Sequence, residues 1–370
     1  MRSRGNRPCM VEGPLSLAAR IHALDSEDMF GHVSRFVDDL EAAFVAINDR
    51  TCPWLVDLRT RTWAGVLCLG MGGSAAGGSF LSSLADRDGT IPVLSHADAA
   101  LPSWVTADWL ILATSYSGNT AETLSATRTA IEHGLTVVVV ATGGELAGLA
   151  ETHEHVHLVG APGGQPPRSA FGHIFGRQVA LMRSLELLSS AQDDAGMFQR
   201  LRAASLLHDP RDGAQGGVEA LAEALLDRSV ALLGPTELGP VLTRFKNQLN
   251  ENSGRFARIG VVPEMNHNEV VAWGGTGDPA DPTVADQAVL LLTWRGVQPE
   301  VRSRIAWMVQ HLETEAAWQL VGEGESLLEV MLYHSIVMDW ISVTLAVHAG
   351  KDPTSIGPIS SLKAHLAEHS

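Results

Sequence analysis

The most constraining feature of this sequence is a series of short, uniformly apolar runs that alternate with segments of helical periodicity. The clearest run spans residues 135–142 and contains four consecutive valines. A strand that is apolar at every position is buried on both faces, and parallel sheets covered by helices bury their strands in this way. The chain is therefore predicted to adopt an α/β fold built on parallel sheets.

The first set of runs predicts a doubly wound domain over residues 51–190. Its strands are predicted at 65–71, 91–95, 109–114, 135–142 and 156–160, with helices at 75–84, 121–133 and 171–188. The second half repeats the scheme loosely, with strands at 229–236, 257–262 and 288–294 and helices at 240–252, 300–314, 327–348 and 359–368. Polar, glycine-containing residues 191–217 are predicted to connect the two domains, so the second domain covers residues 218–370.

Residues 1–50 are predicted to comprise a disordered start, at 1–11, followed by N-terminal helices. Between residues 15 and 47, apolar side chains recur at helical spacing. Arg2, Arg4 and Arg7 precede no apolar segment, so a signal peptide is not expected.

The composition and net charge of the chain favour some classes of protein and partner over others. Hydrophobic residues make up 45% and charged residues 18% of the chain, as in soluble globular proteins. The net charge of −16 disfavours nucleic acid or an anionic membrane surface as the main partner. We find no apolar run of about 18 residues or more, the length expected of a membrane span. Cys9, Cys52 and Cys68 show no paired metal spacing, and a reducing cytoplasm is the expected location.

Two loops of small polar residues follow predicted strands. They read Gly-Met-Gly-Gly-Ser at 70–74 and Ser-Tyr-Ser-Gly-Asn-Thr at 115–120. Asn119 or Thr120 is a suitable N-cap for the second helix, and Glu122 lies in its first turn. Free backbone N–H groups at a helix N-terminus, with short hydroxyls beside them, bind phosphate. Two such loops at neighbouring strand ends are predicted to converge on one phosphate.

The first loop also permits a dinucleotide-binding interpretation. Gly70 to Ala75 match the pattern G-x-G-x-x-A, and Asp98 follows the next predicted strand. This alternative leaves the hydroxyl cluster at 115–120 without a role.

The motifs at 70–74 and 115–123 resemble the sugar isomerase (SIS) domain. Over residues 25–367 the chain resembles the bifunctional phosphoglucose/phosphomannose isomerase family, which has two SIS domains in tandem. The resemblance implies two tandem doubly wound parallel-sheet SIS domains with an N-terminal helical segment. It also implies that the substrate phosphate is bound by Gly73, Ser74, Ser115, Ser117 and Thr120.

Two further positions correspond to catalytic groups of the family. Arg168 follows a Gly/Pro-rich turn, and its planar guanidinium suits a developing enediolate oxygen. Glu251 lies near the end of a helix predicted to be capped by Gly254. A helix C-terminus disfavours a carboxylate and should raise its pKa, as a general base requires. In the resembling family the corresponding glutamate moves the proton between C1 and C2.

The resemblance implies ring-opening roles for His267 and Lys363. In the family this histidine reaches the active site of the neighbouring subunit, which implies a homodimer. Metal binding by His267 with Glu264 and Glu269 is an alternative, although no second histidine stands at ligand spacing.

The expected function is therefore a cytoplasmic aldose–ketose isomerase of glucose 6-phosphate, mannose 6-phosphate and fructose 6-phosphate. The cis-enediolate mechanism that we expect needs no cofactor or metal. A hydroxyl near the sugar, such as that of Thr354, could tune the choice between C2 epimers. Two alternatives stay open: a non-catalytic sugar-phosphate sensor built on the same domains, and an isomerase of another phosphosugar.

Overall fold

The computed structural model describes residues 15–190, 193–212, 216–274, 287–312, 314 and 316–369. Cys9 and the disorder predicted for residues 1–11 therefore lie outside the described residues.

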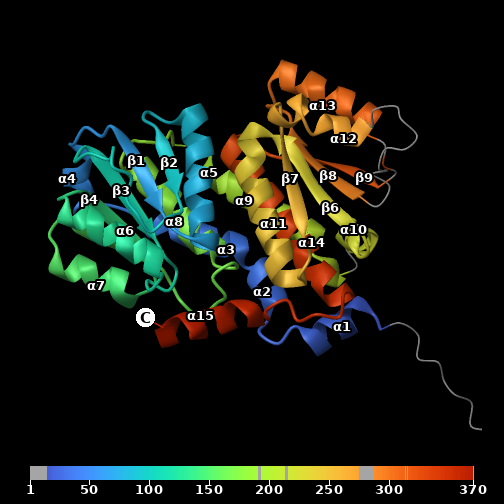
Figure 1. Cartoon of the computed structure of the whole chain (residues 1–370), viewed down its shortest axis with the longest axis horizontal. Helices are drawn as coiled ribbons and strands as arrows, with labels where there is room; N and C mark the ends of the chain where they lie inside the picture. Colours follow the sequence, from blue (N-terminus) through green and yellow to red (C-terminus); the bar gives the residue numbers. More distant parts are fainter. Residues whose placement is uncertain are drawn as a thin grey trace, which may run out of the picture.

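The first domain is built on a parallel sheet with the strand order β2-β1-β3-β4-β5 (Figure 1). Its strands are β1 (Gly65–Leu69), β2 (Val93–His96), β3 (Trp109–Thr114), β4 (Thr136–Ala141) and β5 (Val156–Gly160). Its helices are α5 (Gly72–Asp88), α6 (Ala121–Glu132), α7 (Gly144–Thr152) and α8 (Phe171–Ser184). Helices α6 and α7 cover the outer face, and α5 and α8 cover the face toward the second domain.

The second domain has a parallel sheet with the order β7-β6-β8-β9. Its strands are β6 (Ser229–Pro235), β7 (Ala257–Val262), β8 (Gln287–Trp294) and β9 (Ala317–Gly322). Its helices are α10 (Val218–Leu225), η2 (Thr236–Leu238), α11 (Gly239–Gln248), η3 (Leu249–Ser253), η4 (Glu264–His267), α12 (Val270–Gly274), α13 (Pro299–His311) and α14 (Leu327–His348). The predicted α/β architecture with two parallel sheets is confirmed.

The two domains share one apolar core. Side chains from the inner face of the first sheet, from α8 and from α14 belong to a single buried cluster, whereas α6 and α7 close a separate cluster on the outer face. Helix α5 packs against α11 across the domain boundary. Burial of a shared apolar surface is the main force that fixes the two domains relative to each other.

Helix α14 is long and apolar enough to cross a membrane by length and composition, which our sequence analysis did not note. Within this protein 94% of its apolar window is buried. It is packed by α9 (Asp194–His208), α10 and α11, as expected of a central core helix.

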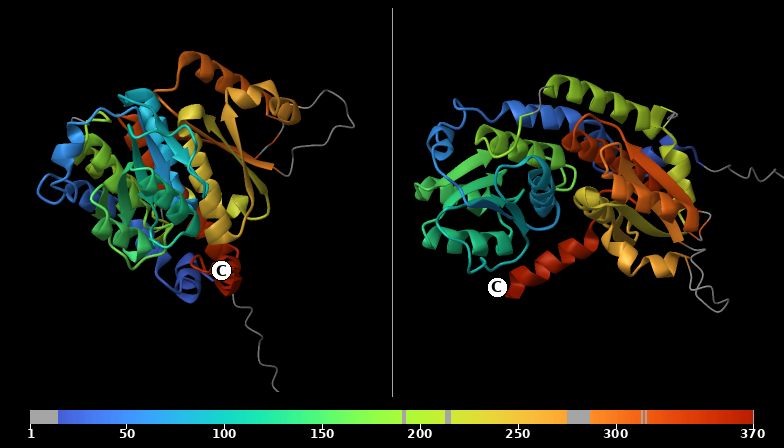
Figure 2. Two further views of the ribbon diagram at one scale, coloured as in Figure 1. Left: turned by 60° about the vertical axis from the view of Figure 1, so that its left-hand side comes forward. Right: turned by 90° about the horizontal axis from the view of Figure 1, so that it is seen from above.

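The remaining helices lie around the two domains. The N-terminal helices are α1 (Leu17–Leu24), α2 (Met29–Ser34), α3 (Phe36–Val45) and α4 (Leu55–Arg59), and η1 (Pro210–Asp212) follows α9. Helix α3 packs on α8, and α1 and α2 contact α14. Helix α15 (Gly357–His369) extends from the second domain to beneath the first (Figures 1 and 2).

Strand register places the two predicted phosphate loops side by side. Leu69, the last residue of β1, pairs with Ala113, and β3 ends one residue later at Thr114. The loops at 70–74 and 115–120 therefore leave the same edge of the sheet from neighbouring strands. Ligands of open parallel sheets bind at this carboxyl edge.

Candidate active site

A hydrogen bond joins the two loops that follow β1 and β3. The backbone N–H of Tyr116 donates to Oγ of Ser74 over 3.2 Å. In the second loop, the hydroxyls of Ser115 and Thr120 lie 2.8 Å apart, and Oγ of Ser117 accepts from the N–H of Asn119. The structure thus gathers four of the predicted phosphate-binding hydroxyls at one place.

The helices that start from these loops have no side-chain cap. Met71 stands at the N-cap of α5 and Thr120 at the N-cap of α6, and neither side chain accepts a backbone hydrogen bond there. The hydroxyl of Thr120 faces Ser115 instead. Uncapped N–H groups at two adjacent helix N-termini are suited to an anion, because the helix dipoles there also favour negative charge.

Gly118 shapes the second loop. Its φ is +71°, and a Cβ at this position would collide with the carbonyl of Gly143. Only glycine suits both conditions. Its carbonyl accepts from the N–H of Leu146, so the loop is fixed against the start of α7.

Arg168 connects this loop region to the second domain. Its side chain is only 4% exposed; Nε donates to Oδ1 of Asn252 over 2.6 Å, and Nη2 donates to the carbonyl of Pro353 over 2.5 Å. A Cβ built on Gly73 would lie 3.8 Å from the Cα of Arg168, in ordinary contact. The backbone of Arg168 thus lies beside the first phosphate loop, while its guanidinium is bound by residues of the second domain.

Glu251 lies on the other side of Arg168. Its Oε2 is 3.8 Å from Nη1 of Arg168, and its side chain is 27% exposed. Burial raises the pKa of Glu251, and the charges of Arg168, Arg244 and Lys363 oppose that rise. The predicted direction of the pKa shift is therefore found, but its main cause is desolvation rather than the helix terminus.

The backbone around Glu251 has an unusual form. The helix predicted at 240–252 is α-helical as far as Gln248 and continues as the π-helical turn η3, which ends at Gly254 in the left-handed conformation. Nζ of Lys351 donates to the carbonyl of Ser253 over 2.8 Å and places a cation at this helix end. π-helical turns widen a helix and often occur at functional sites.

A buried polar network that the sequence analysis did not find supports Asn252. Nδ2 of Asn252 donates to Oγ of Ser342 on α14, over 2.9 Å. One turn earlier on α14, Asp339 accepts a bidentate pair of bonds from Arg244, at 2.7 and 2.8 Å, and a third bond from Gln248. These bonds fix α11 and η3 on α14, and through Asn252 they orient Arg168.

A second unpredicted network holds the segment that carries Arg168. Nε2 of Gln165 donates to Asp39 of α3 over 3.1 Å, and the N–H of Gln165 donates to the hydroxyl of Tyr116. Asp39 also lies 3.2 Å from Nε2 of His173. The phosphate loop and the arginine segment are thus tied to the same N-terminal helix.

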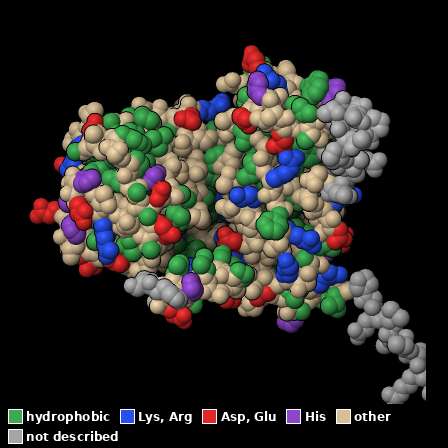
Figure 3. All heavy atoms as spheres, in the orientation of Figure 1, with side chains coloured by type: hydrophobic (Ala, Val, Ile, Leu, Met, Phe, Trp, Pro, Cys, Tyr) green, Lys and Arg blue, Asp and Glu red, His purple; other side chains and the backbone are tan. Residues whose placement is uncertain are grey.

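Glu251 and Asn252 line a cavity of about 460 Å³ together with Lys351, Asp352, residues 355–356 and residues 358–359. Figure 3 shows the molecular surface hollowed between the two domains, above α15. Lys363 lies on α15, and its charge lies near enough to lower the pKa of Glu251. Thr354, beside Pro353, is buried, and its hydroxyl has no hydrogen-bond partner among the described residues.

His267 is not brought to this cavity within one chain. It is exposed on η4, after β7, and among the described residues no hydrogen bond or ion pair joins it to Glu251 or Arg168. Glu269 bonds Arg258 and Trp273, and Glu264 accepts from Asn268. Both carboxylates of the alternative metal site therefore already have partners.

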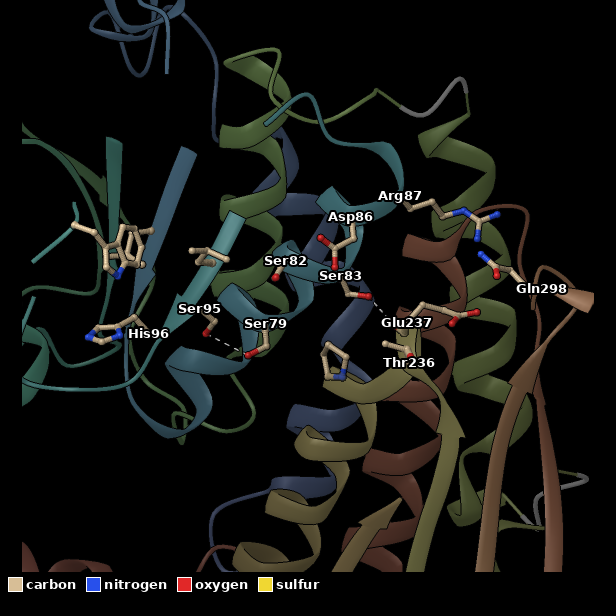
Figure 4. A pocket seen from close by; sticks show the side chains of 14 residues that line it. Ser79, Ser82, Ser83, Asp86, Arg87, Ser95, His96, Thr236, Glu237 and Gln298 are labelled. Carbon is tan, nitrogen blue, oxygen red and sulfur yellow. Dashed lines mark hydrogen bonds between the residues drawn. The ribbon is translucent and has the colours of Figure 1, made fainter. Parts of the chain in front are cut away.

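A different cavity, of about 710 Å³, lies between α5, the edge strand β2 and the start of α11 (Figure 4). Its polar lining includes Ser79, Ser83, Asp86 and Glu237, and Oγ of Ser83 donates to the carbonyl of Glu237. None of the predicted site residues lines it. We therefore locate the candidate active site by the polar groups that converge near Arg168 and Glu251, and not by the size of the cavity.

Comparison with known proteins identifies relatives of this chain. Residues 215–366 match the family "bacterial phospho-glucose isomerase C-terminal SIS domain". The chain is 31% identical to a bifunctional phosphoglucose/phosphomannose isomerase of Aquifex aeolicus, over 83% of this chain and 92% of that protein. It is 32% identical to a protein of the same name from Caldicellulosiruptor bescii, over 82% and 89% of the two chains.

Solved structures share the fold of this chain at lower sequence identity. The structure of tagatose-6-phosphate ketose/aldose isomerase from Escherichia coli superposes with a TM-score of 0.69 at 14% identity, covering 92% of this chain and 96% of that one. At this identity the likeness shows the fold alone. The sequence relatives show more, because the identity extends over most of both chains: this chain belongs to the bifunctional phosphoglucose/phosphomannose isomerase family.

Proposed function

We propose that this protein is an aldose–ketose isomerase that interconverts glucose 6-phosphate, mannose 6-phosphate or both with fructose 6-phosphate. The observation that carries the proposal is the position of Arg168. Its Nη1 lies 3.8 Å from Oε2 of Glu251, and its Cα would be 3.8 Å from a Cβ added to the phosphate-loop residue Gly73. The proposed base is thus adjacent to a fixed cation, and the arginine segment adjoins the first phosphate loop.

The phosphate would be bound at the carboxyl edge of the first sheet. Gly73 and Ser74 at the start of α5, with Ser115, Ser117 and Thr120 before α6, supply N–H groups and hydroxyls without a cationic side chain. Such neutral donors suit a dianion on an acidic protein. Anchoring the phosphate directs the other end of the sugar toward η3 and α15.

Ring opening would use His267 and Lys363. Support for Lys363 is its electrostatic effect on Glu251 from α15. For His267 the support is its exposure among the described residues, since an exposed side chain is accessible to a second copy of the chain. We therefore propose a homodimer in which His267 completes the site of the partner subunit.

Isomerisation would then proceed on the open-chain sugar. The Glu251 carboxylate takes the proton from C2, the C2–H electron pair forms the C1=C2 bond, and the carbonyl π pair moves to O1. The guanidinium of Arg168 stabilises the resulting cis-enediolate, and its bonds to Asn252 and Pro353 hold it in place beforehand. Return of the proton to C1, with transfer of the O2 proton to O1, gives the ketose.

A cytoplasmic location is part of the same proposal. Cys52 and Cys68 are both free and buried in this structure, as is usual for proteins kept in a reducing compartment.

The direct test is to incubate the purified chain with fructose 6-phosphate and identify aldose products. Formation of glucose 6-phosphate or mannose 6-phosphate is expected. Binding without conversion would support the sugar-phosphate sensor, and conversion of only an amino- or heptose-phosphate in a substrate panel would support the other isomerase.

A further inference from the structure

A second group of ionisable side chains lies between α10 and α14, outside the residues assigned to the active site. Glu219 and Glu223 are one turn apart on α10 and so share one face of that helix. His348 is the last residue of α14, which packs along α10. One ligand atom from each of the three residues lies within 4.8 Å of the other two.

The imidazole of His348 is buried without a hydrogen bond at one nitrogen. Its side chain is 6% exposed, and Nε2 has no hydrogen-bond partner among the described residues. Nε2 lies 3.8 Å from Oε1 of Glu219, and Nδ1 lies 3.8 Å from Oε1 of Glu223. The ring is therefore placed between two carboxylates without a hydrogen bond to either.

The surroundings of the His348 ring act on its pKa in both directions. Burial is the main cause that lowers the pKa of His348; the charge of Arg20 lowers it further, and Glu223 and Glu219 raise it. A neutral imidazole carries one N–H, and its other nitrogen then presents a lone pair to the carboxylate that faces it.

A lone pair and a carboxylate facing each other repel, and a cation between them removes the repulsion. We propose that Glu219, Glu223 and His348 bind one divalent transition-metal ion of the Zn²⁺ class, which ties α10 to the end of α14. One imidazole nitrogen and two carboxylate oxygens form a common donor set for Zn²⁺ and leave a position for water. The site has no role in isomerisation.

The geometry allows the ligands to close on an ion. The side chains of Glu219 and Glu223 are 42% and 63% exposed, so both can rotate toward the buried ring. Arg20 is the cation that opposes binding. Its guanidinium bonds the carbonyls of His348 and Leu15, so the hydrogen bonds described for it do not use either carboxylate.

The test measures Zn²⁺ retained by the full-length, tag-free chain after equilibrium dialysis, together with the thermal unfolding midpoint with and without Zn²⁺. About one Zn²⁺ per chain and a rise in Tm are expected. Loss of an outer-shell partner alone weakens a metal site about 10–100-fold, so E219Q/E223Q, which removes two ligands, should bind at least about 100-fold more weakly and lose the Tm rise. X-ray absorption of the bound Zn²⁺ should show one nitrogen ligand among oxygens.

The matched control is E151Q/E154Q, which makes the same charge change at exposed residues beside His153 and His155. This variant should keep both the Zn²⁺ and the Tm rise. If the double variant does not fold, retained Zn²⁺ and Tm are measured on the single variants E219Q and E223Q instead. The proposal is overturned if E219Q/E223Q retains Zn²⁺ and the Tm rise as the unmodified chain does. It is equally overturned if the unmodified chain retains no Zn²⁺, because the three residues then form only an ion-pair cluster.

Discussion

Nη1 of Arg168 lies 3.8 Å from Oε2 of Glu251, while Nε and Nη2 of the same guanidinium are held by Asn252 and Pro353. Nε and Nη2 of the guanidinium thus donate to protein acceptors, and Nη1 is the nitrogen nearest the Glu251 carboxylate. This relationship joins the first domain, which carries the phosphate loops, to the proposed base on the second.

The serine hydroxyls should contribute to phosphate binding. We expect Ser117→Ala to raise KM for fructose 6-phosphate about tenfold to a hundredfold with a smaller effect on kcat, because a hydrogen bond to a charged group contributes about 1.5–3 kcal/mol. Inhibition by inorganic phosphate should weaken in parallel. Ser125→Ala, at an exposed position on α6, is the control and should leave both unchanged. An unaltered KM in Ser117→Ala would remove this serine from the phosphate site.

The pH dependence of kcat/KM should reflect the pKa of the buried Glu251 carboxyl group. Only the ionised form of Glu251 can accept a proton, and burial raises its pKa above the ordinary value of 4.5. kcat/KM should therefore fall as the pH decreases through a pKa above that value. Because the charge of Lys363 lowers this pKa, Lys363→Met should move the acid limb to higher pH.

Lys246→Met serves as the control for that shift, since it removes a lysine charge from α11 without being among the charges that act on Glu251. A pH profile of Lys363→Met that overlays that of the unmodified chain would contradict the position assigned to Lys363.

The buried Arg244–Asp339 pair should contribute strongly to the free energy of unfolding. The two side chains are 6% and 4% exposed, so Asp339→Asn leaves a buried guanidinium without its counter-ion. Breaking such a pair costs about 3–5 kcal/mol, measurable by urea denaturation. Asp57→Asn, which breaks the exposed pair with Arg61, should cost about 1 kcal/mol or less. Equal losses in the two variants would refute the buried network as a support for η3.

Mixing inactive chains should test the proposed homodimer. If His267 acts in the partner's site, a mixed dimer of Glu251→Gln and His267→Asn chains contains one site with both residues intact. After unfolding and refolding together, an equal mixture should recover up to about one quarter of full activity, because half of the dimers are mixed and each has one working site. Recovery of no activity, with dimers present by sedimentation, would place His267 outside the partner's site.

The sequence predicted the buried parts of the fold best. The strand expected at 109–114 coincides with β3, because a uniformly apolar run admits few alternatives. The strand expected at 156–160 also coincides with β5, although β5 contains His157 and is only partly buried. β9 went unnoticed because it lies at a sheet edge and alternates exposed with partly buried residues. Within 191–217 the structure adds α9, whose polar surface hid the buried side chains of Met197, Phe198 and Leu201.

For the candidate site, local motifs together with the family resemblance selected the loops, Arg168 and Glu251, whose roles stay predictions. The motifs could not reveal Ser342 or Asp339, because these residues contact the site from α14, about 90 positions further along the chain. The cause of the pKa shift of Glu251 was also beyond the sequence. A helix end can be recognised from Gly254, but the desolvation that raises the pKa depends on how the two domains pack.

The most direct test of the account follows solvent deuterium into the sugar. In D₂O, the unmodified chain should incorporate deuterium from Glu251 at C1 or C2 of the hexose 6-phosphates, as read by NMR. Glu251→Gln should still bind fructose 6-phosphate but lose about 10²–10⁴-fold in both turnover and deuterium incorporation. Glu27→Gln, which removes another carboxylate that acts on Arg168, should keep both. Near-normal incorporation by a correctly folded Glu251→Gln chain would contradict the assignment of Glu251 as the base.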